Sequence, residues 1–302
     1  MVTPDLAELR DMLSYARPMG SVTELAFVRR YIAPLPGASR DCYGDWHVTT
    51  DLASRILWSA HTDTVHRTEG RQTTHYDEAT GMLLLSKRSK RRGAFCLGAD
   101  DTVGCFLLRH MILAGVPGHY IFHYGEERGG VGSSAIARHD PTFLTRFDHA
   151  IALDRGGLSD VVTHQFSQRT CSDAFARALG TLLGPAYTPS HGVYTDTAEY
   201  AEVIPECSNV SVGYFRAHSV DERVNVAHVF ALLDCLCTAD FATLPIVRDP
   251  SIVEAYDRWD YWTVTPSAVV LPFDGSRVSA IEPISDLTDL DDDDLESALA
   301  HA

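Results

Sequence analysis

Residues 119–134 read HYIFHYGEERGGVGSS, and this stretch decides the fold. The first six residues are apolar or aromatic and predict a short buried strand. Gly125, Glu126 and Glu127 follow, and Gly129 and Gly130 come two residues later. These glycines allow the chain to turn sharply. A Glu-Glu pair by itself is typical of a solvated surface. Two like charges directly after a buried strand would destabilise the fold unless positive charge lies nearby, so the rest of the chain has to decide between the two interpretations.

Three further segments resemble the strand at 119–124. All four are short and apolar: RILWSA (55–60), HYIFHY (119–124), DHAIAL (148–153) and NVSVGY (209–214). Helical patterns lie near 102–114, 131–139, 172–183 and 226–240. Two more helices are expected at the N-terminus, one after Thr3-Pro4 and one after the capping box that begins at Ser21. This alternation predicts an α/β fold with three αβα layers, in which helices cover both faces of a central, mostly parallel mixed sheet.

Composition and charge exclude several classes of partner. The chain has 302 residues and a formal net charge of −16, which argues against nucleic acid and anionic membranes as partners. The N-terminal residues show no apolar signal core, and no apolar run approaches membrane-spanning length. Seven scattered cysteines are typical of a reducing compartment, and we expect Cys42, Cys96, Cys105 and Cys235 to be small core side chains. These features predict a soluble, cytoplasmic protein.

Two charged segments stand apart from this pattern. Residues 66–92 predict a long polar hairpin with the basic tip KRSKRR (87–92), which is typical of a solvated loop, with anion binding as the alternative. Residues 281–302 carry eight acidic side chains and no Lys or Arg. We expect residues 273–302 to form a flexible acidic tail, with docking on a partner as the alternative.

Metal-ligand residue types follow each predicted strand. They are His61 and Asp63 after the first strand, Glu126 and Glu127 after the second, Asp154 after the third and His218 after the fourth. An Asp100-Asp101 pair begins the helix near 102–114. Each residue alone has an ordinary explanation, such as a helix cap or a solvent-facing histidine. Because ligands bind beyond the carboxyl ends of parallel strands, we expect the whole set to meet at one edge of the sheet.

The set predicts a dinuclear metal site. Histidine and carboxylate ligands without a thiolate suit Zn²⁺ at a catalytic site, with Co²⁺ or Mn²⁺ as alternatives. Five ligands are too many for one open catalytic zinc, but they suffice for two ions that share a carboxylate and a bridging water. Two cations would also offset the repulsion between the crowded acids. One of the two adjacent glutamates would then bind metal, and the other would stay free as a general base.

At this point the sequence resembles the dinuclear zinc exopeptidase superfamily. The matching pieces are DCYGDW (41–46), SAHTDTV (59–65), LGADDTVG (97–104), GEERGGVGS (125–133), ALDRGG (152–157) and the run from Tyr194 to Glu222. The resemblance implies the zinc-peptidase type of αβα fold. It implies that His61 and Asp154 hold one metal, Glu127 and His218 the other, and that Asp100 bridges them. Further roles are implied as follows: Glu126 as catalytic carboxylate, Asp63 as the group that fixes the tautomer of His61, and Asp101, Tyr194 and Asp196 as supporting residues.

The length of the segment between Asp154 and His218 indicates which branch of the superfamily the chain resembles. Carboxypeptidase-type members insert a lid domain between the equivalents of Asp154 and His218, whereas only 63 residues intervene here. We therefore expect one catalytic domain over residues 1–272, similar to the single-domain aminopeptidases. The implied reaction is hydrolysis of a small peptide or aminoacyl substrate, in which a metal-bridging hydroxide attacks and Glu126 moves the proton. Whether the chain forms a homo-oligomer is left open.

Other functions share the same residues. A non-peptide amidase, a deacylase or a carboxypeptidase would use the same dinuclear site, because fold does not fix the substrate. A glutaminyl-cyclase-like transferase would need only one zinc, which the five-residue set disfavours. A catalytically inactive binding module is the alternative from a different class, and the presence of Glu126 argues against it. GGVGSS lacks the Gly-Lys-Ser/Thr ending of a phosphate-binding loop, and no GxSxG elbow indicates a serine hydrolase.

Overall fold

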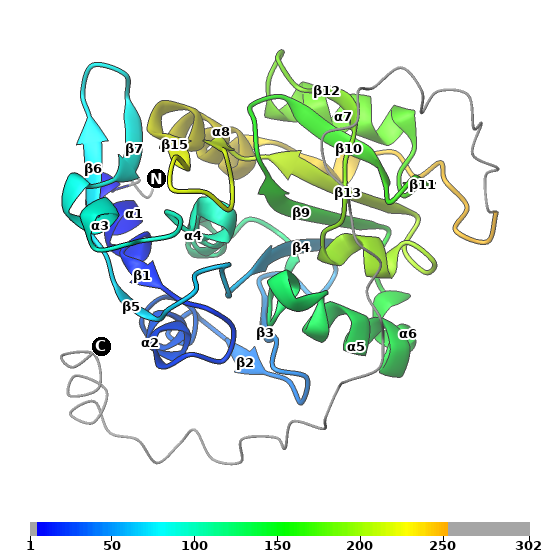
Figure 1. The fold of residues 1–302 in the computed structure, drawn as a ribbon. Helices are drawn as coiled ribbons and strands as arrows, with labels where there is room; N and C mark the ends of the chain where they lie inside the picture. Colours follow the sequence, from blue (N-terminus) through cyan, green and yellow to red (C-terminus); the bar gives the residue numbers. More distant parts are fainter. Residues whose placement is uncertain (1–4, 253–302) are drawn as a thin grey trace.

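A computed structural model describes residues 5–252. A nine-stranded sheet forms the middle of the molecule, with the strand order β11-β10-β13-β9-β4-β8-β3-β2 and with β12 paired to β10 (Figure 1). Its strands are β2 (Ser39–Arg40), β3 (Trp46–Thr49), β4 (Ile56–His61), β8 (His119–His123), β9 (His149–Arg155), β10 (Asp160–Gln165), β11 (Gln168–Arg169), β12 (Thr188–His191) and β13 (Glu206–Ser211).

The four middle strands, β13-β9-β4-β8, run parallel to one another. β10 and β3 continue the sheet on either side as antiparallel neighbours. The expected α/β class with a mixed sheet is therefore confirmed. Because the middle strands are parallel, His61, Asp154 and the Glu126-Glu127 pair all lie at or just beyond the same edge of the sheet.

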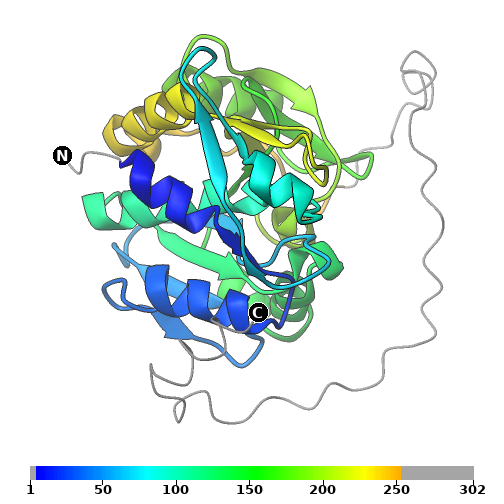
Figure 2. The same cartoon turned by 60° about the vertical axis from the view of Figure 1, so that its left-hand side comes forward.

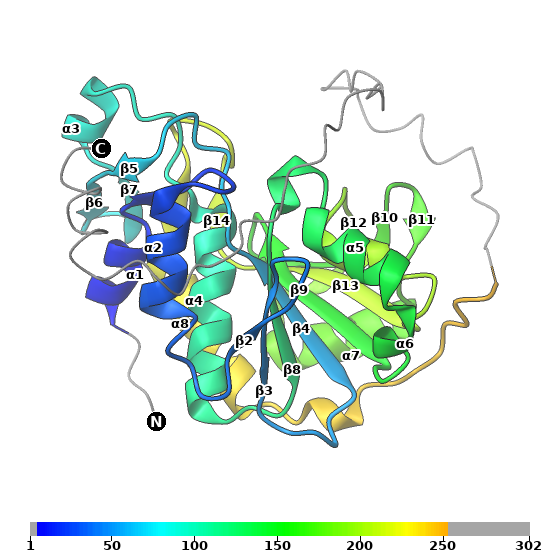
Figure 3. The same cartoon turned by 90° about the horizontal axis from the view of Figure 1, so that it is seen from below.

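Helices cover both faces of this sheet (Figure 3). One face packs with α1 (Leu6–Met12), α2 (Val22–Tyr31), α4 (Ala99–Ala114), α7 (Asp173–Leu183) and α8 (Val226–Thr238). The other face carries α5 (Val131–His139), α6 (Pro141–Leu144) and the 3-10 helix η2 (Asp196–Tyr200). Strand alternation divides the core: Trp58 belongs to the first cluster of buried side chains and Leu57 to the second. The three-layer arrangement follows from this alternation.

A smaller antiparallel sheet stands beside the first. Its order is β14-β15-β7-β6, and its strands are β6 (Thr74–Asp77), β7 (Met82–Leu85), β14 (Tyr214–Phe215) and β15 (Arg223–Asn225). Figure 2 shows its β6–β7 hairpin in cyan next to α1 in blue. β1 (Tyr15–Ala16) and β5 (Gly70–Arg71) form a further two-stranded pair. The predicted hairpin within 66–92 is present, but the basic run is not its tip, because Lys87–Arg91 form the helix α3.

Several local expectations need correction. The first helix begins after the N-cap Asp5 and ends by Leu13, and the predicted Thr3 cap lies outside the described residues. The fourth strand ends at Ser211, because the chain breaks away there to form β14 in the smaller sheet. Cys42 is exposed, since it lies in the turn between β2 and β3 rather than in the core. The predicted acidic tail, residues 273–302, lies outside the described residues.

Within residues 5–252, no helix combines the length and the apolar character that crossing a bilayer requires.

Candidate metal centre

His61 ends β4 with its imidazole buried. Its Nδ1 lies 3.1 Å from the backbone oxygen of Asp63 and 3.3 Å from that residue's Oδ1. A carbonyl oxygen can only accept, so Nδ1 carries a proton, and Nε2, the nitrogen left to bind a metal, faces the other ligand candidates. Asp63 thus approaches Nδ1 with its main-chain oxygen as well as its carboxylate. The carboxylate also accepts the backbone N–H of Glu126 at 3.1 Å, which ties the glutamate turn to the His61 loop.

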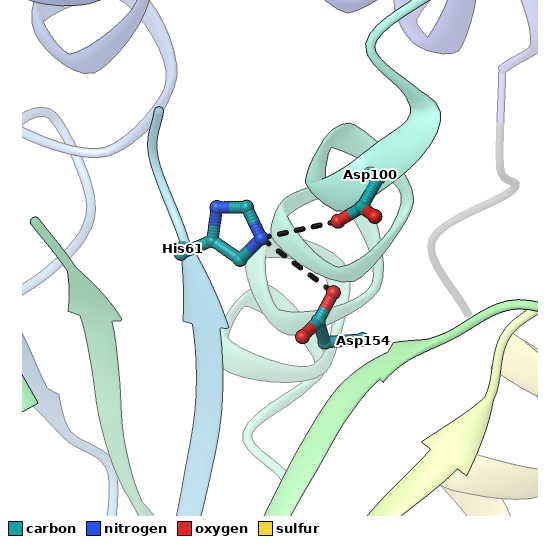
Figure 4. A group of neighbouring side chains, drawn as sticks. All are labelled: His61, Asp100 and Asp154. Carbon is teal, nitrogen blue, oxygen red and sulfur yellow. Dashed lines mark hydrogen bonds and ion pairs between the residues drawn. The ribbon is translucent and has the colours of Figure 1, made fainter. Parts of the chain in front are cut away.

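Asp100 lies between the two histidines, at the start of α4. Its Oδ1 is 3.2 Å from His61 Nε2 and its Oδ2 is 3.2 Å from His218 Nε2. Figure 4 shows Asp100 and Asp154 both directed at the imidazole of His61 from separate elements. The neighbouring Asp101 is directed away from the cluster and accepts the backbone N–H groups of His61 at 3.2 Å and Gly104 at 2.8 Å. Asp100 therefore contacts both histidines, whereas Asp101 is bound to backbone N–H groups.

The two glutamates of the opening motif lie in the 3-10 turn η1 (Glu126–Arg128). Gly125 before them has φ 75° and ψ 37°, a left-handed conformation that a side chain would strain, so the expected glycine turn is present. Glu127 Oε1 is 3.0 Å from His218 Nε2, whereas Glu126 Oε2 is 3.9 Å from His61 Nε2. In this 3-10 turn the side chains of Glu126 and Glu127 diverge, so that Glu126 faces His61 and Glu127 faces His218.

Asp154 is held from three sides near the end of β9. Asn209 accepts its backbone N–H at 3.0 Å and donates to its carbonyl at 3.2 Å, and Tyr214 donates to the same carbonyl at 3.0 Å. Thr195 donates to Oδ2 of the carboxylate at 2.7 Å. The other oxygen, Oδ1, is buried and makes no hydrogen bond, although His61 Nε2 lies 3.5 Å away. A fully oriented carboxylate with an unused buried oxygen is what a cation ligand requires.

These side chains form two overlapping groups that fit two cations. His61, Asp100 and Asp154 bring one ligand atom each within 4.8 Å of one another, and so do Asp100, Glu127 and His218. Asp100 is common to both, with one oxygen toward each histidine. His61, Glu126 and Glu127 form a third such group, so the distances make Glu126 a further ligand candidate. Nitrogen and carboxylate oxygen donors in this arrangement fit borderline divalent cations such as Zn²⁺.

The electrostatics of the cluster favour added positive charge. Burial, followed by the charge of Asp154, raises the pKa of Glu126 well above its usual range. Burial and then the Asp100 charge raise the pKa of Asp154 to about 7. Although burial acts in the same sense on Asp100, hydrogen bonds with His218 and His61 hold the pKa of Asp100 below its usual value. The hydrogen bond with Asp100 is also the main reason why the pKa of His218 rises to about 11. Divalent cations would supply the charge that imidazolium groups supply here.

The supporting residues named from the sequence lie at different depths. Asp196 begins η2, is buried, accepts the hydroxyl of Ser133 and leaves Oδ2 without a hydrogen bond. Its charge is one of those that raise the pKa of Glu126. Tyr194 lies at the wall of the pocket, and its buried hydroxyl also lacks a hydrogen bond. Neither belongs to the two ligand groups described above.

Sequence reasoning did not identify Glu222, which holds the segment 97–100, the Asp100 loop, in place. Its buried carboxylate accepts four consecutive backbone N–H groups, from Leu97 and Gly98 at 2.7 Å each, Ala99 at 3.1 Å and Asp100 at 3.2 Å. Four donors on one carboxylate fix the path of the loop into the cluster. The sequence offered only the position of the residue, an acid four residues after His218.

Arg17 was also missed, and it lies beneath the cluster. Its guanidinium group is fully buried over the ring of Phe27. It donates to the carbonyl of Thr62 and, at 2.6 Å, to the hydroxyl of Thr102. Arg17 therefore links the loop that follows His61 to the first turns of α4, and it places a positive charge behind the carboxylates. Nothing in its local sequence distinguishes it from a surface arginine.

The cluster opens into a cavity of about 380 Å³. The candidate ligands Asp100, Glu127, Asp154 and His218 line one side together with Glu126. The remaining wall includes Val162, Val193, Tyr194 and Phe215 as apolar or aromatic residues and Arg155 and Arg216 as cations. A cavity of this size next to clustered carboxylates can hold a small organic substrate.

Comparison with solved structures identifies the same fold in several peptidases. Aminopeptidase PepT from Bacillus cereus superposes with a TM-score of 0.59 over 77% of this chain and 96% of its own, at 13% identity. A tripeptidase from Staphylococcus aureus gives 0.58 over 77% and 96%, also at 13% identity. The TET1 peptidase of Pyrococcus horikoshii gives 0.54 over 77% and 98%, at 15% identity.

The chain has the aminopeptidase fold. The structural resemblance predicted from the motifs is confirmed at this level, and identities of 13 to 15% extend it no further than the fold. No protein-family model and no curated protein matches the sequence. The activity of this chain therefore has to be argued from its own residues.

Proposed function

We propose that this chain is a metal-dependent hydrolase that cleaves the peptide bond of small peptide or aminoacyl substrates, most simply as an aminopeptidase. One observation carries the proposal. Asp100 directs one carboxylate oxygen toward His61 and the other toward His218, so two ligand groups share a single bridging residue. The fold it shares with aminopeptidases and a tripeptidase supports the same reading.

Each side chain has a distinct role in this proposal. His61 and Asp154 would hold one divalent cation, Glu127 and His218 the other, and Asp100 both; Zn²⁺ suits them best, with Co²⁺ or Mn²⁺ as alternatives. When bound, such ions polarise a carbonyl group and lower the pKa of water to about 7.

Glu126 is the proton carrier of the proposed reaction. Its side chain lines the cavity, and its Oε2 lies 3.9 Å from His61 Nε2 rather than in contact with it. The carboxylate accepts a proton from the attacking water and delivers it to the departing amine. Burial is the main cause that raises the pKa of Glu126 well above its usual range, which is the direction that a carboxylate general acid–base group requires.

Glu126 and its neighbour provide a matched pair of variants. Glu126→Gln should retain bound metal and the folded state while kcat falls about 10²–10⁴-fold, the usual contribution of a general acid–base group. Glu127→Gln should instead lose metal, because it removes a ligand. Elemental analysis and hydrolysis of dipeptides measure the two effects. Full turnover by Glu126→Gln with metal bound would rule out the assignment.

The aminopeptidase hypothesis requires a free α-amine on the substrate. Carboxylates next to the cavity suit a cationic amine, so unblocked dipeptides should be cleaved faster than their N-acetylated forms. A panel of both, with aminoacyl anilides, measures the preference. Faster cleavage of the blocked compounds would move the assignment to a deacylase or amidase that uses the same residues.

The remaining sequence expectations belong to this proposal. We propose one catalytic unit without a lid domain, located in the cytoplasm. In residues 5–252, the strands β10 to β13 between Asp154 and His218 extend the central sheet, which supports the first point. The Pyrococcus horikoshii peptidase assembles into a tetrahedron or a large octahedral shell. Light scattering on this chain is the direct test of the homo-oligomer that the sequence left open.

A further inference from the structure

The basic helix α3 concentrates positive charge on an acidic protein. Five of the six residues 87–92 are basic, and Lys87 and Lys90 are the only lysines among 302 residues. The buried Ser89 anchors the helix, because its Oγ accepts the backbone N–H of Thr73 at 2.8 Å and donates to that residue's carbonyl at 3.1 Å. The five cations are all exposed. α3 is therefore a fixed platform with its charges directed outward.

This arrangement opposes helix formation unless an anion is near. The pairs Lys87–Arg91 and Arg88–Arg92 place like charges four residues apart, and no acid occupies the first turn. Lys90 alone has an ion pair among the described residues, with Asp221 at 3.4 Å. For the other four cations, residues 5–252 provide no ion-pair partner, so the platform retains most of its charge.

A basic pocket opens next to α3. It has a volume of about 620 Å³, and Arg67, Arg71, Arg88 and Arg92 line it. The guanidinium group of Arg67 lies over the ring of Phe95, 4.1 Å from its centre. Glu69 is the single acid among the lining residues, and it accepts hydrogen bonds from Thr23 at 3.3 and 3.4 Å. Arg71 is already paired with Asp11 at 2.7 Å, so the pocket offers the guanidinium groups of Arg67, Arg88 and Arg92, the preferred donors for carboxylates.

We propose that α3 and this pocket bind the acidic segment 286–296 of the same chain. That segment reads DLTDLDDDDLE and supplies seven carboxylates within eleven residues. It is the densest block of opposite charge that the sequence contains. The proposal is independent of the hydrolase function proposed above, because none of its residues belongs to the metal cluster.

The connection is long enough for binding within one molecule. α3 and the last described residues lie at opposite ends of the molecule (Figures 1 and 3). The 33 residues 253–285 can span at most roughly 110 Å when extended. A compact unit of about 250 residues has a radius of gyration of about 18 Å, so a path around it is within reach. Because the acidic segment is tethered, its effective concentration at α3 is about millimolar. A free polyanion has no tether and is repelled by a chain of net charge −16.

Carbodiimide cross-linking tests the proposal on the full chain. The reagent joins carboxylates to lysine amines at zero length, and α3 holds every lysine of the sequence. We expect peptides that contain Lys87 or Lys90 to be joined to the 286–296 segment in monomeric protein. The link should disappear in about 1 M NaCl, where the screening length is about 3 Å. Lys90 and Asp221, 3.4 Å apart, provide an internal control that the reagent reaches the helix.

Two sets of variants and an isotope experiment complete the test. The combined substitutions Asp291→Asn, Asp292→Asn, Asp293→Asn and Asp294→Asn should lower the yield of tail links about sixteenfold. The pair Arg88→Gln and Arg92→Gln should lower it about fourfold, because exposed ion pairs contribute about twofold each. Arg146→Gln with Arg177→Gln is the matched control and should change nothing. If the control link forms without any tail link, the proposal is wrong. If a mixture of ¹⁴N and ¹⁵N chains gives mainly mixed links, the occupant is a second copy, and the assignment to the same molecule is overturned.

Discussion

The Asp100 loop depends on Glu222, and the substitution Glu222→Gln measures how much. The carboxylate accepts four backbone N–H groups at 2.7 to 3.2 Å. The amide of glutamine presents one accepting oxygen and one donating nitrogen, so about two of the four N–H groups lose their acceptor. Each buried donor left unsatisfied costs about 1–3 kcal/mol.

A second effect opposes this loss. Burial, and then the charge of Asp100, raises the pKa of Glu222 to about 7, so the ionised carboxylate is itself costly in the fold, and a neutral side chain relieves part of that cost. We therefore expect the free energy of unfolding to fall by about 2–3 kcal/mol, toward the lower end of the range for two lost acceptors. Because the same loop carries Asp100, affinity for Zn²⁺ should fall about 10–100-fold, as for other groups that orient metal ligands.

Urea unfolding and zinc titration of the metal-free protein measure the two effects. The neighbouring Asp221 is a matched control, because its side chain is 57% exposed and pairs only with Lys90 and Arg216 among the described residues. Asp221→Asn should change stability by no more than about 0.5 kcal/mol. If Glu222→Gln behaves like Asp221→Asn in both measurements, then Glu222 does not position the loop.

Three further predictions concern the frame around the site. Gly104→Ala places a Cβ 2.2 Å from the carbonyl oxygen of Leu153, so it should lower the free energy of unfolding by about 3 kcal/mol or more; an unchanged urea midpoint would contradict the close packing of α4 on β9. Arg17→Met should cost about 3–5 kcal/mol, because buried carboxylates lose their cation, and a melting temperature equal to that of the wild type would show that this charge is dispensable. The hydrogen bond with His110 is the main reason why the pKa of Glu8 falls to about 2, so its stabilisation is present above pH 4.5 and is lost as the pH falls toward 2. Glu8→Gln should therefore lower stability at pH 6 and converge with the wild type near pH 2, and a difference independent of pH would refute this.

The parts of the fold that were predictable have local causes. RILWSA at 55–60 is a strand because its β-rich side chains are buried on both faces, and the structure places β4 at Ile56–His61. The capping box at Ser21 is also present, and Ser21 accepts the backbone N–H of Glu24 at 3.0 Å. In a capping box the side chain of Glu24 would also accept the N–H of Ser21, but here it accepts the N–H of Gly20 instead.

The candidate ligands were predictable because parallel strands bring their carboxyl ends together. His61, Asp154 and the glutamate pair follow strands that are adjacent or next to adjacent in the sheet, so sequence order and the topology of an open α/β sheet are enough to unite them. His218 lies in the connection between β14 and β15 of the smaller sheet. It was identified by its place in the motif order, and its distance from the others depends on how the two sheets pack.

The residues that escaped prediction act over long sequence separations. Glu222 bonds to backbone groups 122 to 125 residues away, and Arg17 bonds to Thr102, 85 residues away. No local pattern specifies such contacts. The basic run at 87–92 was misjudged for the opposite reason. Its charge predicts an open loop, but the Ser86 cap and the buried Ser89 hold it as a helix.

The candidate centre is divided between two separately hydrogen-bonded sheets. His61 and Asp154 end strands of the large sheet, whereas His218 lies in the connection between β14 and β15 of the small one. His218 has a φ of 61° and a side chain that is 50% exposed, and its Nε2 lies 3.2 Å from Asp100 and 3.0 Å from Glu127. Metal ions bound by His61 and by His218, with Asp100 as a common ligand, would connect the two sheets. Hydrogen exchange in β14 and β15 should then slow when Zn²⁺ is added, while exchange in β4 and β9 stays as it was.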